Sequence, residues 1–229
     1  ECQHGVGVPQ EVPAESLRED DYLLLPTPEH GDVHVEPIFA RLVGWVAADG
    51  YLHSSGALSF TFSPKTGKVE LVVACLKDNG LEPKLYPRVR DDLVQVSVGV
   101  SEVGRSLQEY IRGTTSGKRL TNKVLEWDRE SLLQMLGAYI DGDGHVPTVG
   151  KNRGQLRIRS ASRSMLLALA DAIRAVGIPC TSNWDMSPGW VTIDPAYGEY
   201  WSDGSGCVSV SAKFSEEVTC YSRRGFHRP

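Results

Sequence analysis

A nine-residue segment that occurs twice constrains this chain more than any other feature. Residues 42–50 read LVGWVAADG and residues 136–144 read LGAYIDGDG, so both copies are apolar, contain small residues at helical spacing and end in Asp-Gly. Glycine commonly follows the last residue of a helix. The repeat therefore predicts two helices of the same kind, each stopping beside an aspartate, Asp49 in the first copy and Asp143 in the second.

Small residues form a strip on each predicted helix. Gly44 and Ala48 lie four residues apart in the first copy, as do Ala138 and Gly142 in the second, and residues four apart share a helix face. Two strips without bulky side chains let helix backbones approach closely. Neither segment is long enough to span a bilayer. The strips therefore predict a tight helix pair in a soluble core, with the repeat acting as an internal dimer interface.

The predicted helix ends favour divalent cations. A helix C-terminus leaves carbonyl groups unpaired and carries the negative end of the helix dipole, here beside Asp49 or Asp143. Hard cations such as Mg²⁺ take carboxylate, carbonyl and water oxygens, and two of them can stabilise the attacking and leaving oxygens of a phosphodiester displacement. A single Asp-Gly after an apolar stretch is most often a helix end and nothing more. Two copies favour a shared site.

In these motifs the chain resembles the LAGLIDADG homing endonucleases, of the monomeric kind with two motifs in one chain. The resemblance implies that an antiparallel sheet follows each motif helix and lies in the DNA major groove. It also implies that Asp49 and Asp143 bind metal ions at the scissile phosphates and that the carbonyls of Ala48 and Gly142 help to coordinate these ions. The implied ion is Mg²⁺, with Mn²⁺ or Ca²⁺ able to replace it for binding.

The two halves differ at two positions that bear on this site. The sixth motif position is Ala47 in the first copy and Asp141 in the second, and we assign no role to Asp141. Lys213 ends an expected strand just before FSEEV, where the resembled family often has its active-site lysine. Gly99 aligns with it in the first half. Lys213 is therefore the expected catalytic cation, although a lysine at a strand end is otherwise an ordinary edge residue.

The spacing of the motifs sets the expected fold. Asp49 and Asp143 lie 94 residues apart, enough for one αββαββα-type half, so we expect an α+β protein of two pseudo-symmetric halves packed through the motif helices. Alternation and helical periodicity give the same element order in both halves. The expected elements are strand 57–63, helix 67–79, strands 84–90 and 93–100, helix 101–111, strand 155–160, helix 164–176, strands near 181–193 and 207–213, and a helix or turn from 215. Residues 185–206 read as a long irregular hairpin connection.

Charge is distributed unevenly along the chain. The net charge is −5, but residues 1–40 hold nine acids against one base, so the rest of the chain is basic. We therefore divide the chain into an acidic N-terminal arm (1–38), a first half (39–115), a linker (116–128) and a second half (129–229). The arm, with an expected strand at Tyr22–Leu25, resembles the segment that leads from an intein's splicing domain into its endonuclease. An arm packed on the sheet is the alternative.

Basic and amide side chains recur on one face of the expected strands. Arg157 and Arg159 share a face because strand residues alternate, and so do Lys84 and Arg88. Such a face can read base edges in the major groove, with arginine to guanine and glutamine to adenine. A solvated sheet face is the alternative. The expected DNA-binding residues are Lys65, Lys84, Arg88, Arg90, Gln95, Lys151, Arg153, Arg157, Arg159 and Arg163. Contacts to phosphate or solvent are expected for Lys65, Lys68, Lys118, Arg119 and Lys123.

Cysteine and histidine usage argues against other sites. The five cysteines show no ligand clustering and indicate reduced thiols, which suits a cytoplasmic protein. His53 and His145 follow the two motifs at different offsets and are expected in surface turns rather than as metal ligands. We find neither a signal peptide nor a membrane-spanning segment.

These features together predict a site-specific double-stranded DNA endonuclease that acts as a monomer on a long pseudo-symmetric target. The resemblance implies cutting across the minor groove to leave short 3′ overhangs. One alternative is a cleavage-inactive relative, such as a maturase or transcription regulator, which keeps the helix pair for packing. A structural module without DNA affinity is another.

Overall fold

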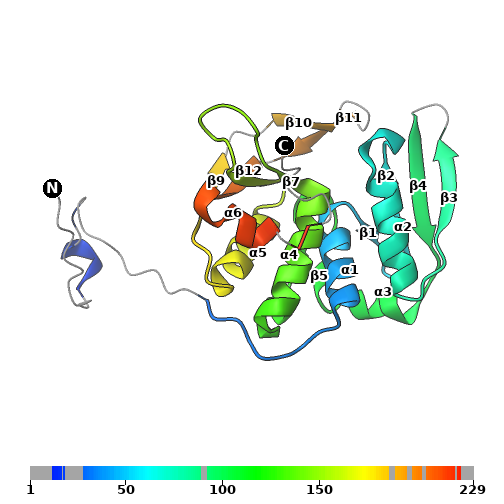
Figure 1. The fold of residues 1–229 in the computed structure, drawn as a ribbon, viewed down its shortest axis with the longest axis horizontal. Helices are drawn as coiled ribbons and strands as arrows, with labels where there is room; N and C mark the ends of the chain where they lie inside the picture. The colour runs from blue at the N-terminus through cyan, green and yellow to red at the C-terminus, as the bar shows by residue number, and fades with distance from the viewer. Residues whose placement is uncertain are drawn as a thin grey trace.

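Two helices from the motif copies form the centre of the fold. They are α1 (Pro37–Ala48) and α4 (Arg129–Asp143), and the computed structural model places one helix-and-sheet unit on either side of them (Figure 1). The structure describes residues 12–16, 18, 28–88, 92–185, 189–194, 198–202, 205–219 and 221–222. The protein is α+β with antiparallel sheets, as expected.

The helix pair is as tight as the small-residue strips predict. A Cβ atom added to Gly44 would lie 2.2 Å from the Met135 carbonyl oxygen and 2.9 Å from Ala138 Cβ. On the other helix, a Cβ atom added to Gly142 would lie 2.4 Å from Ala48 Cβ. Each glycine therefore faces the alanine of the opposite copy, and both are required because their helices touch backbone to backbone.

The glycines that follow the motif aspartates have a packing role. Gly144 has φ −81°, and Gly50 is not among the left-handed glycines either, so neither forms a left-handed cap. A Cβ atom on Gly50 would lie 2.6 Å from Val46 Cα, and one on Gly144 would lie 2.6 Å from Ile140 Cγ2. The helices end where expected, but glycine is needed there because the chain folds back against the preceding turn.

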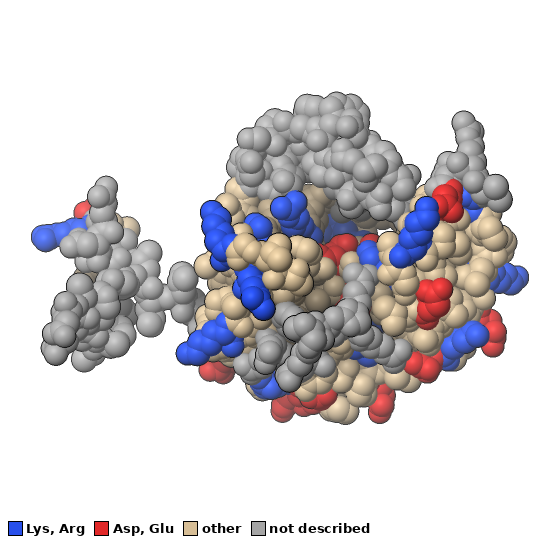
Figure 2. All heavy atoms as spheres, turned by 45° about the horizontal axis from the view of Figure 1, so that its top comes forward, with Lys and Arg blue, Asp and Glu red and all other residues tan. Residues whose placement is uncertain are grey.

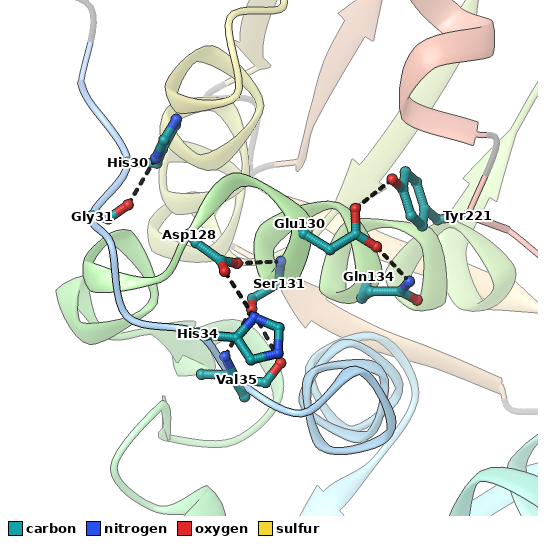
Figure 3. A network of polar contacts seen from close by, with 9 residues as sticks. All are labelled: His30, Gly31, His34, Val35, Asp128, Glu130, Ser131, Gln134 and Tyr221. Atoms are coloured by element: carbon teal, nitrogen blue, oxygen red, sulfur yellow. Dashed lines mark hydrogen bonds and ion pairs between the residues drawn. The ribbon is translucent and has the colours of Figure 1, made fainter.

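The segments that enter the two motif helices lie side by side. Val33 forms a parallel bridge with Trp127, and the Asp128 amide donates to the Val33 carbonyl at 2.8 Å. Asp128 caps α4 by accepting a hydrogen bond from the Ser131 amide, and its carboxylate lies 2.8 Å from His34 Nδ1 (Figure 3). Although burial opposes it, these hydrogen bonds from Ser131 and His34 lower the pKa of Asp128. The same polar network holds both helix starts in register.

Each half contains a four-stranded antiparallel sheet with the same strand order. The first has the order β1-β2-β4-β3 and the second β7-β8-β12-β9. Their strands are β1 (Tyr51–Leu52), β2 (Leu58–Phe62), β4 (Leu93–Val98) and β3 (Lys84–Arg88), and β7 (Gly144–His145), β8 (Leu156–Ser160), β12 (Ser205–Val210) and β9 (Cys180–Asp185). The repeat in sequence is thus a repeat in topology, with β1 equivalent to β7 and β2 to β8.

Helices cover one face of each sheet. In the first half, α2 (Lys68–Asp78) packs over strands whose inward residues Leu58, Phe60 and Phe62 are buried. In the second half, α5 (Arg163–Ala175) packs over β8, β9 and β12. As expected, both helices are followed by a left-handed glycine, Gly80 or Gly177. Two shorter helices, α3 (Glu102–Leu107) and α6 (Ala212–Thr219), follow the last strand of each sheet.

Three expected segments differ in the structure. Helix 101–111 is shorter, because Ile111–Arg112 (β5) pairs with Arg119–Leu120 (β6). The predicted end of strand 207–213 is wrong, since β12 stops at Val210 and Lys213 lies in α6. The expected irregular excursion contains an antiparallel hairpin, β10 (Gly189–Asp194) with β11 (Gly198–Ser202), whose register shifts between Thr192 and Asp194. Short 3₁₀ turns occupy Ala14–Ser16, Pro64–Thr66, Thr115–Gly117 and Asn122–Glu126.

Asp141, at the position where the two motif copies differ, belongs to a buried ion pair. Its Oδ2 lies 2.9 Å from Arg41 Nη2, and its Oδ1 accepts a hydrogen bond from the Ser222 hydroxyl. Arg41 also donates to the Tyr221 carbonyl at 2.6 Å. The pair therefore joins α1, α4 and the segment after α6. Breaking one partner of such a pair typically costs about 3–5 kcal/mol, because the other charge stays buried.

Other expectations lie partly outside the described residues. Trp45 and Tyr139 are buried in the core, as expected. Cys75, Cys180 and Cys207 are free thiols, whereas Cys2, Cys220, Arg90 and strand Tyr22–Leu25 lie outside the part that the structure describes. None of the helices in that part is long and apolar enough to cross a membrane.

The close contact between α1 and α4 predicts that one methyl group added at Gly44 destabilises the fold. Helix interiors favour alanine over glycine by about 1 kcal/mol, but Gly44→Ala places its methyl group against the Met135 carbonyl. We expect a net loss of about 1–3 kcal/mol in unfolding free energy, measured by urea denaturation. Gly99→Ala is the control, because its added Cβ meets nothing within 4 Å. Equal stability of Gly44→Ala and the unaltered protein would contradict the close contact.

Candidate active site

The helix crossing brings the two motif aspartates together. Asp49 caps the C-terminal end of α1, and its side chain is 20% exposed. A Cβ atom on Gly142 would lie 3.1 Å from Asp49 Oδ2, so this carboxylate rests against the last turn of α4. Asp143 is the last residue of that helix. Two acids 94 residues apart in the sequence therefore meet at the end of the helix pair.

Lys68 forms an ion pair with the first of these acids. Its Nζ lies 2.9 Å from Asp49 Oδ2, and both side chains are largely buried. The same ammonium lies 5.7 Å from the centroid of the Phe62 ring. Lys68 is the first residue of α2, directly after the left-handed Gly67. The expectation that Lys68 contacts phosphate or solvent is wrong for this structure, because the turn before α2 aims it at Asp49.

Lys118 binds the end of α1. Its ammonium donates to the carbonyls of Val46, Ala47 and Ala48 at 2.9, 3.1 and 3.3 Å. These belong to the last turn, where helix carbonyls have few backbone partners, although the Val46 carbonyl also accepts from the Gly50 amide at 3.2 Å. Burial lowers the pKa of Lys118 to about 8, although Asp143 and Asp49 act in the opposite direction. Lys118 is thus a buried cation close to both motif acids, so the expectation of a solvated side chain is wrong for this lysine.

The backbone of Lys118 is also anchored to the second half. Its carbonyl accepts a hydrogen bond from the Ser162 hydroxyl, and Ser162 is the residue that caps α5. The stretch 116–128, expected as a linker, therefore delivers a side chain to the site. Sequence reasoning missed Lys118 because GKRL carries no pattern that distinguishes a buried lysine from a solvated one.

A symmetry signal was available for Lys68. It is the first residue of α2, and Arg163 is the first residue of the equivalent helix α5. Alignment of the two halves at these helix starts would have paired the two basic residues.

Lys213 lies in a different setting from the one expected. It is exposed on α6, and its Nζ lies 5.1 Å from the centroid of the Phe214 ring. The lysines whose contacts place them at the aspartates are Lys68 and Lys118. Lys213 is a prediction that the geometry leaves without direct support.

The oxygen atoms at the helix ends fit a hard divalent cation. The carboxylates of Asp49 and Asp143 and the carbonyls of Ala48 and Gly142 are all hard donors, the type that Mg²⁺ prefers. Among the described residues, no group of three or more His, Cys, Asp or Glu side chains forms a metal site. The acids would therefore hold an ion together with water and phosphate oxygens, as Mg²⁺ is commonly held at phosphate sites. Lys118 already binds the Ala48 carbonyl, so a cation there would share that oxygen.

The sheet faces away from the helices are polar. Arg157 and Arg159 share one face of β8, and Gln95 on β4 donates to Ser97 at 3.2 Å. In the same sheet of the first half, Lys84 on β3 pairs in register with Ser97 on β4. Lys65 forms an exposed ion pair with Asp92. Figure 2 shows acidic atoms in the hollow between the halves, with basic side chains on either side. Lys151 and Arg153 lie in the β7–β8 connection.

Comparison with known sequences gives a partial match. No protein-family model matches the chain. It is 24% identical over 179 residues to SufBD family iron-sulfur cluster assembly proteins of Mycobacterium bovis and Mycobacterium tuberculosis. The match covers 74% of this chain, and the chain spans 21% of the length of those proteins.

Comparison with solved structures identifies the fold. The homing endonuclease I-WcaI bound to its DNA recognition sequence has a TM-score of 0.54 at 12% identity, covering 84% of this chain and 83% of that one. Full-length DUF199/WhiA from Thermatoga maritima scores 0.51 at 11% identity, covering 82% and 56%. I-DmoI with its target DNA and Mn scores 0.50 at 12% identity, covering 83% and 95%. The chain therefore has the LAGLIDADG fold.

The position of Lys118 predicts how the site responds to metal. We expect Lys118→Met to raise the affinity for Ca²⁺ by about tenfold, or roughly 1.4 kcal/mol, because it removes a cation that uses the Ala48 carbonyl. Isothermal titration calorimetry measures the change. Lys65→Met removes an exposed lysine and should leave the affinity unchanged. The same Ca²⁺ affinity in Lys118→Met and the unaltered protein would show that Lys118 and the metal do not compete.

Proposed function

We propose that the chain is a site-specific double-stranded DNA endonuclease that hydrolyses phosphodiester bonds with divalent metal ions. The observation that carries the proposal is the contact of Asp49 with the last turn of α4, which places both motif acids at one point. Polar faces of two sheets flank that point. A pair of acids flanked by two polar sheet faces suits cutting of both strands of a duplex.

Asp49 and Asp143 hold the metal in this proposal, with the carbonyls of Ala48 and Gly142 as further ligands. Bound Mg²⁺, for which Mn²⁺ or Ca²⁺ substitutes in binding, supplies positive charge to the phosphate oxygens. Lys118 lies close to both acids, and its ammonium stabilises negative charge that develops on the phosphate. Lys68 fixes the orientation of the Asp49 carboxylate through its ion pair.

The partner is duplex DNA along a long pseudo-symmetric target. Base contacts come from the two outer sheet faces, and phosphate contacts come from the loop residues Lys151 and Arg153 and from Arg163 at the start of α5. The proposed organisation is an arm (1–38), two halves (39–115 and 129–229) and a connection (116–128) in a monomeric, cytoplasmic protein. Descent from an intein-borne endonuclease is part of the proposal and rests on the resemblance of the acidic arm to the segment that precedes an intein's endonuclease.

A cleavage-inactive nucleic-acid-binding protein is the second candidate. The observation that favours it is that Lys68 and Lys118 already engage the Asp49 carboxylate and the Ala48 carbonyl. These ammonium groups neutralise the helix ends without metal, which suits a protein that keeps the helix pair for packing alone. The two candidates differ in cutting, whereas both bind DNA.

Cleavage of a randomised duplex library in Mg²⁺ tests the proposal. We expect cuts at one extended sequence, and we expect Asp49→Asn and Asp143→Asn each to slow cutting by about a hundredfold or more, the scale of removing one electrostatic contact to a transition state. Asp171→Asn is the matched control, because Asp171 lies on α5 in a partly buried pair with Arg174, away from the motif acids. It should cut normally.

Three results are informative in this experiment. Cuts that need both motif acids support the endonuclease. Selective capture of one sequence without cutting supports the second candidate instead. A chain that neither captures nor cuts duplex DNA overturns both.

A further inference from the structure

The two sheets can be compared residue by residue because their registers match. Tyr51 lies two residues after Asp49 and pairs with Ser59, and His145 lies two residues after Asp143 and pairs with Arg157. Ser59 on β2 and Arg157 on β8 therefore occupy equivalent positions. One step further along the same face, the equivalent residues are Thr61 and Arg159. These four residues are the outer-face positions nearest the motif acids on the second strand of each sheet.

The edge strands carry the opposite pattern. Lys84 on β3 pairs with Ser97, and Thr181 on β9 pairs with the equivalent Ser209, so a lysine in the first half faces a threonine in the second. Asn183 continues the neutral row on β9. Positive charge therefore lies on β8, the second strand of the sheet, in the second half, and on the edge strand β3 in the first half. The backbone is pseudo-symmetric, whereas its outer-face chemistry is not.

Arg157 and Arg159 are placed to accept a ligand. Their cross-strand neighbours on β12, Ser209 and Cys207, are small and uncharged. Arg157 is half-buried, and its Nε is a buried atom without a hydrogen-bond partner among the residues that the structure describes. Buried polar atoms are nearly always paired, so an unpaired donor calls for an explanation. A guanidinium group offers two parallel donors that match O6 and N7 of guanine in the major groove, whereas serine and threonine do not select guanine.

We propose that the DNA target is chemically asymmetric, with guanines at the inner positions of the half-site under the second sheet, read by Arg157 and Arg159. The equivalent inner positions under the first sheet meet Ser59 and Thr61 and are not restricted to guanine. This asymmetry fixes the direction in which the chain lies on the duplex. The inference rests on the proposed function, since it needs duplex DNA in the sheet faces.

Selection by binding tests this without cleavage. Duplexes are captured from a randomised library by the whole chain in Ca²⁺ and sequenced, and the selection is repeated with Arg157→Gln and with Arg159→Gln. We expect each variant to lose guanine preference at one inner position of one half-site, by about five- to a hundredfold, the scale of one bidentate contact. Ser59→Ala and Thr61→Ala are matched controls and should leave those guanine positions unchanged.

A stronger test of the asymmetry exchanges the outer-face side chains between the two halves. A chain carrying Ser59→Arg, Thr61→Arg, Arg157→Ser and Arg159→Thr should prefer guanine in the opposite half-site. Thermal melting of this exchanged chain beside the unaltered one establishes whether it folds. If it does not fold, the guanine preferences of Arg157→Gln and Arg159→Gln alone test the proposal.

The failures can be told apart. Equal guanine content at the inner positions of both half-sites overturns the asymmetry but not the function. A uniform loss of affinity for all sequences in Arg157→Gln and Arg159→Gln shows phosphate contacts and also overturns the asymmetry. Capture of no sequence at all by the unaltered chain overturns the proposed function itself.

Discussion

The close contact between the backbones of α1 and α4 is the constraint on which the rest of the structure depends. Gly44 and Gly142 leave no room for a side chain, because each faces an atom of the opposite helix closer than a Cβ would allow. This contact sets the separation of the two sheets and places Asp49 against the end of α4. A wider crossing would keep both halves folded, but it would separate the acids and remove the shared site.

The contact has an electrostatic consequence. Two helix C-termini and two carboxylates gather negative charge at one point, and the fold supplies Lys68 and Lys118 to offset it. The lowered pKa of Lys118 shows that burying this ammonium is unfavourable despite both acids. Farther from the site, the buried pair of Arg41 and Asp141 joins the helices to the end of the chain. Charges thus fix the helix pair at two levels, one at the helix ends and one in the core.

Local patterns predicted most of the fold and half of the site. The motif helices, the glycines of their interface and the ends of α2 and α5 follow from periodicity and glycine placement, which short segments reveal. The lysines were harder to predict, because their neighbours come from elsewhere in the chain. Lys118 binds α1 from 70 residues away, and Lys213 was misplaced because β12 ends three residues earlier than alternation indicates. Asp141 had no assigned role until the structure placed its partner Arg41, which lies 100 residues away in the sequence.

Pseudo-symmetry in this chain applies to the backbone and the acids but not to the basic residues on the outer sheet faces. Strand order, register and the positions of Asp49 and Asp143 repeat, since all of them follow from packing two copies of one unit. Outer-face residues such as Ser59 and Arg157 lie on the sheet face opposite the covering helices, so packing of the core does not require them to match. A single chain is free to vary them independently, whereas a homodimer with one sequence is not. Fusing two halves therefore separates the geometry of the site from the chemistry of recognition.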